Sequence, residues 1–363
     1  MRTKRKSAKI ATLRGLFDMA IQSRLTAVSK PDSGPRIRRT CVSLLVFVAL
    51  FFNALVWATS QPQSGPLDEI LVTGERPGPA LWRVSNGTHD LWILATLVPL
   101  PKHMTWRSHA VENRIALSQV VLAPPEIMAD MDFFGNPVYG QSLVRAQKIR
   151  DHRSLKQILP NDLYIRWEAV KNQYLGSTYD EHTRPLLDAL RLYQAATEQS
   201  GLTTDESVWR TVEHISHQNH VKIVPTVINL KMDTPAVWIG EFVSVPLSQE
   251  QDCLEKTIER VEADIEPMRH RANLWSVGDV EGLRALTYTD DRITCFNAVF
   301  SVPKFHAEID QAVAQMYDEW LAAAETALSQ NVSSFAVLPI SELLKADGWL
   351  DRLRAKGYAI KEP

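Results

Sequence analysis

Four motifs that carry common enzyme chemistry are missing from this chain of 363 residues. It has no phosphate-binding P-loop, no dinucleotide-binding GxGxxG, no GxSxG nucleophile elbow and no HExxH zinc helix. Internal repeats are missing as well. Because these motifs are missing, the sequence gives no support to a nucleotide-dependent enzyme, a serine hydrolase with a nucleophile elbow or a helical zinc protease.

Cysteine is scarce, with three residues in the chain. Cys41 lies inside an apolar run, which leaves Cys253 and Cys295 in the body, 42 positions apart. Two cysteines without further ligands nearby do not make a zinc site. In an oxidising compartment we expect this pair to form a disulfide, worth about 2–4 kcal/mol of stability; two buried thiols are the alternative.

The chain also lacks an excess of basic charge, since 40 Lys and Arg stand against 42 Asp and Glu. The distribution is uneven. Residues 1–40 carry 11 basic and two acidic side chains, residues 41–58 carry none, and residues 59–363 carry 29 basic and 40 acidic ones. Neutralising nucleic-acid phosphates requires a basic face, so we expect no nucleic-acid partner. The basic segment 1–40 is better explained as part of a signal that targets the chain to a membrane.

One long hydrophobic run is present, over residues 41–58, directly after Arg36, Arg38 and Arg39. It is either a signal peptide cleaved after Ala58 or a single transmembrane anchor with the arginines on the cytoplasmic side. Met1 and Met19 both remain possible starts. Either alternative exports residues 59–363, to a bacterial-type periplasm or to the outer side of a membrane that 41–58 still spans.

The rest of the chain is predicted to hold a tether with a first strand over 59–80 and one domain over 81–363. With 45% apolar residues the chain can form a packed core. Short strands are separated by helices, and Asn86-Gly87 is a hairpin signal. This pattern predicts an α/β domain with a helical insertion in the middle. Expected strands cover 81–84, 91–98, 120–123, 221–228, 334–339 and 358–361; expected helices cover 110–118, 162–175, 185–199, 203–219, 248–286, 307–329 and 341–356; residues 125–160 are expected to be irregular.

Three histidines, His214, His217 and His220, look at first like a metal site. On a helix, a three-residue step turns each successive side chain by about 300°, so the third imidazole drifts away from the first. Zinc helices usually use a four-residue step. A polar helix face is the favoured interpretation.

The two ends of the predicted domain carry distinctive residues. They are Leu81, Trp82, Arg83, Val84, 91–98, Pro101, Trp106, Arg107 and Ser108 at the start, and Phe335, Ala336, Val337, Asp347, Gly348 and 353–358 at the end. These residues resemble the TraB/GumN family, which opens with a hairpin that leads into a Gly-x-x-His motif and then a W-x-S helix start. The family closes with a second Gly-x-x-His, a D-G-L-L helix and an R-G-Y strand. The resemblance covers about residues 81–360 and implies a mixed central β-sheet flanked by helices.

The family includes the Tiki proteins, membrane-associated metal-dependent peptidases whose site gathers both histidines, a Glu and an Arg. Here the histidine of the first motif is replaced by Val98, and that of the second by Glu342. The expected carboxylate falls on Ala123, and the arginine aligns with Met316. A catalytic divalent ion needs about three protein ligands, so these replacements predict a catalytically degenerate member without a cofactor.

Our leading hypothesis is therefore an envelope protein that binds an unknown ligand or protein partner. The alternative is a divergent metal-dependent hydrolase with rebuilt ligands for manganese, cobalt or zinc. Its candidate ligands are His103, His109, Glu112, Glu126 and Glu342. Glu342 is the one catalytic candidate, although a carboxylate in the first turn of a helix also suits the helix dipole. A third possibility is a structural role centred on anchoring by 41–58.

Overall fold

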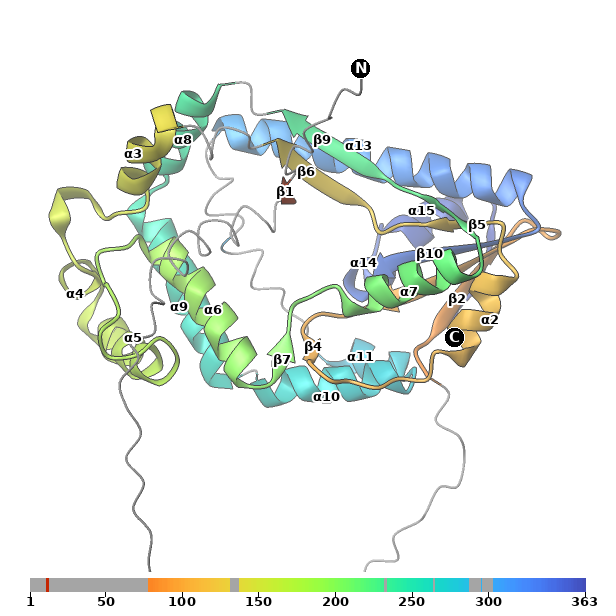
Figure 1. Ribbon diagram of the computed structural model, residues 1–363, viewed down its shortest axis with the longest axis horizontal. Coiled ribbons are helices and arrows are strands. Elements are labelled where there is room, and N and C mark those ends of the chain that lie inside the picture. Colours follow the sequence, from red (N-terminus) through yellow and green to blue (C-terminus); the bar gives the residue numbers. More distant parts are fainter. Residues whose placement is uncertain are drawn as a thin grey trace, which may run out of the picture. The chain divides into compact units, whose positions relative to one another are not determined.

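The computed structural model describes residues 11–12, 78–130, 137–231, 234–263, 265–286, 295 and 303–363 (Figure 1). The apolar run 41–58 lies outside these residues, as do the tether before residue 78 and all of the basic segment except Ala11 and Thr12. None of the described helices is both long enough and apolar enough to cross a membrane.

A six-stranded mixed sheet forms the centre of the fold, in the order β11-β2-β3-β10-β5-β8. Strands β2 (Leu81–Ser85) and β3 (Asp90–Thr96) form the antiparallel hairpin predicted at Asn86. The Asn86 side chain accepts hydrogen bonds from the backbone N–H groups of Thr88 and His89, which closes the turn. The other strands are β10 (Ser333–Pro339), β5 (Val120–Leu122) and β8 (Lys222–Val224), parallel to β3, and β11 (Ala359–Lys361), antiparallel to β2.

Prolines end two of these strands, and the chain after each proline continues into a second sheet. Pro124 and Pro125 follow β5, and Pro225 follows β8; proline has no N–H to donate to a ladder. The chain then continues as β6 (Glu126–Asp130) and β9 (Val227–Lys231), which pair in parallel, and β1 (Ala11–Thr12) is antiparallel to β6. A two-stranded antiparallel ladder joins β4 (Leu100–Pro101) to β7 (Leu202–Thr203).

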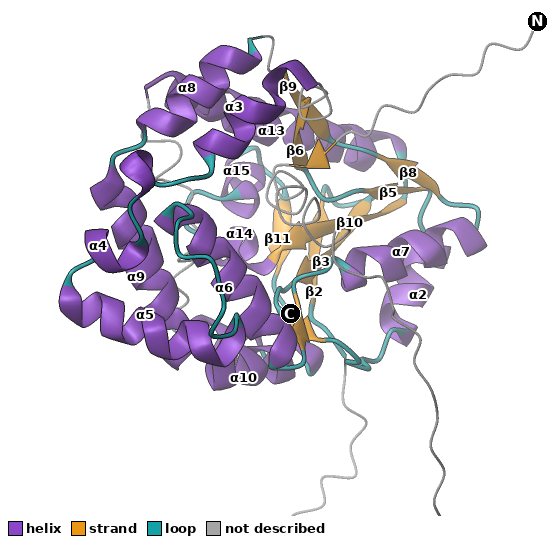
Figure 2. Ribbon diagram, turned by 60° about the vertical axis from the view of Figure 1, so that its left-hand side comes forward, coloured by secondary structure: helices purple, strands orange, loops and turns teal. Residues whose placement is uncertain are grey.

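Helices flank the central sheet and bury its strands (Figure 2). Helix α13 (Pro303–Gln330) and α15 (Trp349–Ala355) lie on one side, and α2 (His109–Ala116) and α7 (Ser207–Gln218) on the other. Helix α14 (Ile340–Leu344) follows β10, while α10 (Ile265–Ser276) and α11 (Val280–Ala285) pack together. Four tryptophans anchor this core, and Trp275 donates its indole N–H to the carbonyl of Ala95 over 2.9 Å. They are Trp82, Trp275, Trp320 and Trp349.

The remaining helices form the predicted helical insertion, which has an apolar core of its own. Trp167 lies at its centre, and the adjacent carboxylate of Glu181 accepts hydrogen bonds from the Trp167 indole over 3.1 Å and from Lys171 over 2.9 Å. The helices are α3 (Pro137–Ala146), η2 (Arg150–His152), α4 (Leu155–Ile158), α5 (Asn161–Tyr174), α6 (Pro185–Gln199), α8 (Pro235–Ser244) and α9 (Leu247–Ala263).

The prediction of a mixed sheet flanked by helices is confirmed. The prediction of an irregular stretch over 125–160 is wrong, because β6, α3, η2 and α4 lie there. The predicted strand over 221–228 is two strands, split at Pro225. The predicted last helix is also two, α14 and α15; at Gly348 a side-chain carbon would come within 2.5 Å of the carbonyl oxygen of Glu342.

Candidate functional site

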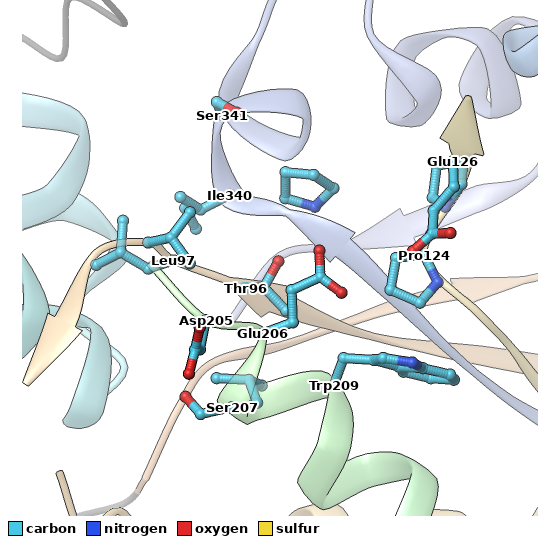
Figure 3. Close-up of a pocket in the computed structure, with 14 residues that line it drawn as sticks. Thr96, Leu97, Pro124, Glu126, Asp205, Glu206, Ser207, Trp209, Ile340 and Ser341 are labelled. Carbon is cyan, nitrogen blue, oxygen red and sulfur yellow. The ribbon is translucent and has the colours of Figure 1, made fainter. Parts of the chain in front are cut away.

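A cavity of about 220 Å³ opens at the carboxyl ends of the parallel strands (Figure 3). Ligands of open α/β sheets characteristically bind at this edge, where loops from several strands meet. The lining residues come from the end of β3, the turn between β5 and β6, the start of α7 and the β10–α14 junction. They are Thr96, Leu97, Val98, Pro124, Pro125, Glu126, Asp205, Glu206, Ser207, Val208, Trp209, Pro339, Ile340 and Ser341.

Both segments that resemble the Gly-x-x-His motifs converge on this cavity. Val98, at the position that the resemblance assigns to the first histidine, lines it together with Thr96 and Leu97. Three residues of the second motif line it from the β10–α14 junction: Pro339 at the end of β10, and Ile340 and Ser341 at the start of α14. Strands β3 and β10 are adjacent and parallel, in register up to Pro339 and Thr96. The two motifs therefore meet although more than 240 positions separate them along the chain.

The charged residues that line the cavity, among those the structure describes, are all acidic: Glu126, Asp205 and Glu206. Figure 3 shows the carboxylates of Glu126 and Glu206 turned toward the same space, with Asp205 beside Ser207. Glu126 is partly buried, and its pKa is raised from the ordinary value by burial and by the negative charge of Glu206. The cavity is thus a site of negative potential in which one carboxyl group holds its proton more tightly than usual.

The other walls are apolar and aromatic. Val98, Pro124, Pro125 and Ile340 supply apolar surface, and the indole of Trp209 projects from the first turns of α7. Carboxylates combined with an aromatic face attract cations, through charge pairing and through the electron-rich ring. The chemistry of the walls therefore suits a small group of positive charge.

Local structure explains where Glu126 and Glu206 sit. The N–H of Glu126 donates to the carbonyl of Thr226 at the start of the β6–β9 pair. Glu206 is the N-cap residue of α7, and its carbonyl accepts a hydrogen bond from the N–H of Arg210. The helix predicted over 203–219 begins at Ser207, and the Thr203 hydroxyl accepts a hydrogen bond from the N–H of Asp205.

Of the proposed metal ligands, Glu126 alone lines the cavity. His103 is exposed in the turn after β4, and His109 is exposed at the start of α2, with its Nδ1 3.2 Å from the Asn113 amide. Glu112, also on α2, accepts a hydrogen bond from the Ser108 hydroxyl. The structure does not bring these groups together with Glu126.

Glu342 points away from the cavity toward helix α13. Its carboxylate accepts a hydrogen bond from the Tyr317 hydroxyl and lies 3.7 Å from the Lys345 amine. Burial and this carboxylate raise the pKa of Tyr317. Because Arg352 also lies 4.5 Å from the Tyr317 ring, these contacts tie α14 and α15 to α13. In this position Glu342 helps to hold α14 against α13.

The divalent ion that the resemblance implies does not fit this donor set. Val98 and Ala123 have no lone pair to offer, Met316 packs against the core, and Glu342 is turned elsewhere. Within the described part of the chain, no three His, Cys, Asp or Glu side chains are grouped so that they could hold one ion. The histidines 214, 217 and 220 are all exposed, and His220 has a positive φ of 55° in the turn after α7.

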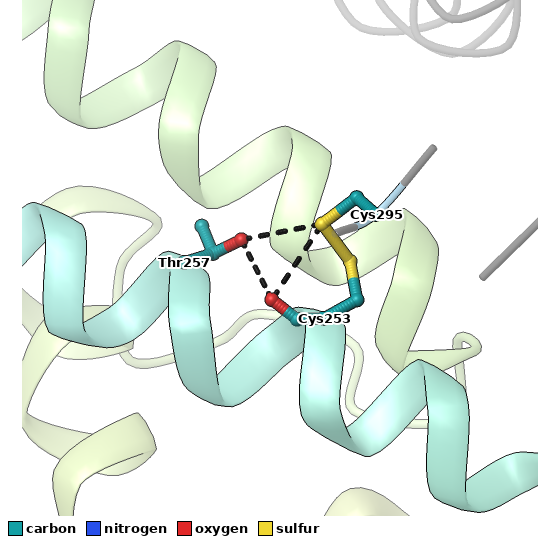
Figure 4. The surroundings of a disulfide bond; sticks show 3 residues. All are labelled: Cys253, Thr257 and Cys295. Carbon is teal, nitrogen blue, oxygen red and sulfur yellow. Dashed lines mark hydrogen bonds between the residues drawn. A yellow bond between two sulfur atoms is a disulfide. The ribbon is translucent and has the colours of Figure 1, made fainter. Parts of the chain in front are cut away.

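The disulfide expected between Cys253 and Cys295 is present (Figure 4). Cys253 is fully buried on α9, and the Thr257 hydroxyl one turn later donates to the Cys253 carbonyl over 2.8 Å and lies 3.6 Å from the Cys295 sulfur. The bond fixes Cys295 to the core of the helical insertion, which includes both half-cystines.

Comparison with known proteins gives one family. The TraB/PrgY/gumN family matches residues 80–362, which is nearly all of the part that forms the sheet, its flanking helices and the insertion. No curated protein and no solved structure matches the chain. The chain belongs to the TraB/PrgY/gumN family.

Proposed function

We propose that this protein is an exported or membrane-anchored family member that binds a small cationic ligand in the cavity, without the metal-dependent chemistry of the Tiki proteins. The observation that carries the proposal is the composition of the cavity. Both degenerate motifs reach it, its described charged residues are all acidic, and Trp209 supplies an aromatic face. An ammonium or guanidinium group is the chemistry that such walls recognise.

The replaced residues support the loss of catalysis. A valine at the first histidine position and an alanine at the carboxylate position remove two ligands, and neither side chain can polarise a substrate or activate water. The apolar wall of Val98 and Ile340 that results is suited to contact with the alkyl part of a ligand. In this proposal the cavity lies where the resemblance places the family's metal site, but its side chains bind an organic cation in place of a metal ion.

The alternative is a divergent metal-dependent hydrolase that holds manganese, cobalt or zinc through Glu126 and Glu206. It is favoured by the raised pKa of Glu126, because shifted pKa values cluster at functional sites. It requires a third ligand to move toward this pair. The two functions differ in what the carboxylates bind, an organic cation or a metal ion.

The test is calorimetric titration of the full chain with n-butylammonium and n-butylguanidinium, which imitate the ends of lysine and arginine side chains, and with n-pentanol as a neutral control of similar length. We expect the cations to bind and the alcohol to bind at least about tenfold more weakly, since charge-assisted hydrogen bonds contribute about 1.5–3 kcal/mol. Glu126→Gln and Glu206→Gln should each weaken cation binding about tenfold. The exposed Glu281 on α11 gives the matched control Glu281→Gln, which should change nothing. Equal binding of cation and alcohol would contradict the proposal.

Export is tested separately by sequencing the N-terminus of the protein recovered from the cell envelope. A mature start near Thr59 identifies a cleaved signal peptide. Retention of residues 41–58 identifies an anchor. Recovery of the intact chain from the cytoplasm would contradict both.

A further inference from the structure

Basic side chains gather at one end of the helical insertion, although the body of the protein is acidic. Residues 145–156 contain five Lys and Arg and one acidic residue, Asp151. Lys148 is paired with Asp180 over 2.5 Å. The other four basic residues are exposed: Arg145, Arg150, Arg153 and Lys156.

This basic segment lies beside two helices that pack against each other, α3 and α8. Arg145 belongs to the last turn of α3. Arg150 donates a hydrogen bond over 3.1 Å to the carbonyl of Val243, near the end of α8, so η2 is held against that helix. Figures 1 and 2 both show α3 and α8 side by side.

The same helices expose apolar side chains. Val138 and Val144 on α3 are 77% and 56% exposed, and Val237 on α8 is 39% exposed. The exposed residues of α8 carry no charge: they are Ala236, Val237, Gly240 and Ser244. In the described residues of α3, η2 and α8, the acidic side chains are Asp151 on η2, which lies within the basic segment, and Glu241 on α8, which is partly buried.

We propose that this α3–α8 surface, formed by Val138, Val144 and Val237 with the four exposed basic residues, docks on the anionic headgroups of a lipid bilayer. Anionic headgroups attract basic side chains, and exposed apolar side chains enter the boundary between headgroups and acyl chains. The positive charge of the four basic residues is complementary to the negative charge of these headgroups, which favours an anionic bilayer as the partner of this surface. The protein's own basic segment 1–40 would be repelled, since it carries 11 Lys and Arg against two Asp. The inference is independent of the ligand in the cavity and holds with residues 41–58 cleaved or retained.

The experiment uses the full chain with Cys41→Ser, so that a single introduced cysteine can be labelled while the Cys253–Cys295 disulfide stays intact. An environment-sensitive NBD dye is attached at Val144→Cys, and in a matched control at Leu117→Cys, which is 64% exposed at the end of α2. Each protein is added to vesicles of phosphatidylcholine alone or with about one third phosphatidylglycerol. We expect a blue shift at position 144 only with the anionic lipid, reversed by salt, and no lipid-dependent change at position 117.

Charge variants test the recognition itself. Each basic residue near an anionic surface contributes about fivefold in partition, so Arg145→Gln with Arg153→Gln should weaken the response about twentyfold. Arg354→Gln with Lys361→Gln removes the same charge elsewhere and should leave it unchanged. Circular dichroism confirms folding, and the single variant Arg153→Gln serves if the pair misfolds. The proposal is overturned by equal responses at positions 144 and 117, by no dependence on anionic lipid, or by salt-sensitive self-association through this surface without lipid.

Discussion

The hydroxyl of Tyr179 donates a 2.5 Å hydrogen bond to Oδ1 of Asp188, a carboxyl group with no exposed surface in the first turn of α6. Arg191 donates to the Tyr179 hydroxyl over 3.0 Å and lies 3.5 Å from the same carboxyl oxygen. No hydrogen-bond partner for the other oxygen, Oδ2, is found among the described residues. Burial raises the pKa of Asp188 to about 8, against the smaller lowering effects of Tyr179 and Arg191.

This raised pKa predicts how stability depends on pH. An aspartate of the unfolded chain titrates near pH 4, so between about pH 4 and pH 8 the folded state holds a proton that the unfolded state has lost. The free energy of unfolding should therefore fall as the pH rises through this range and level off above it. Asp188→Asn should flatten the slope, as measured by urea unfolding at a series of pH values.

Asp180 provides a control of opposite sign. Its hydrogen bonds with Lys148 and His182 lower its pKa, so it stabilises the fold above its unfolded pKa and loses that effect as the pH falls. Asp180→Asn should reduce stability near neutral pH and leave the loss between pH 4 and pH 8 in place. An Asp188→Asn protein with the wild-type slope would show that Asp188 is ionised in the folded state.

A second prediction concerns the buried ion pair of Arg184 and Glu250. The guanidinium of Arg184 donates to Glu250 Oε1 from its Nε–H over 2.8 Å and again from Nη2, and it also donates to the carbonyls of Phe242 and Val245. Glu250→Gln should lower the free energy of unfolding by about 3–5 kcal/mol, because it leaves a buried guanidinium without its counter-charge.

The surface pair Arg166–Glu262, at 2.7 Å, gives the comparison. Glu262→Gln should cost less than about 1 kcal/mol, as exposed ion pairs do. Guanidinium chloride unfolding measures both. Replacing Arg184 and Glu250 together by Met should cost clearly less than the sum of the two single changes. Additive costs would mean that the two charges do not depend on each other.

Much of the fold could be predicted from local patterns. The Asn86-Gly87 hairpin and the helix that begins at Pro185 depend on residues adjacent in the chain, and both are found as expected. The secondary structure of residues 125–160 is harder to predict from the sequence, because β6 becomes a strand only by pairing with β9, about a hundred positions away. Short elements whose order comes from distant partners leave little periodicity in the sequence.

The third prediction concerns the Cys253–Cys295 disulfide. Replacing both residues by Ala should lower the free energy of unfolding by about 2–4 kcal/mol, since the bond closes a loop of 42 positions that the unfolded chain would otherwise sample. Urea unfolding with and without dithiothreitol gives the same comparison in the wild-type chain. Mass spectrometry without reduction should find the two peptides linked. Two alkylatable thiols in protein from the envelope would contradict the prediction.

The sequence indicates where the candidate site lies better than it indicates which residues form it. The resemblance identified Val98 and the segment around Ile340, which do line the cavity. Asp205 and Glu206 are not among the predicted site residues, although a helix is predicted over 203–219. The signal that could have found them is that this helix begins at the carboxyl edge of the sheet. Glu342, the catalytic candidate, does not line the cavity, because its side chain faces the neighbouring helix and accepts a hydrogen bond from Tyr317.

The most direct test of the central claim is the metal content of the full chain after incubation with manganese, cobalt or zinc and removal of the excess. A cavity that has lost its metal chemistry and binds an organic cation should retain no stoichiometric ion, and n-butylguanidinium should still bind afterwards. One ion retained per chain, and lost in Glu126→Gln but not in Glu281→Gln, would contradict the account and establish the metal-dependent alternative.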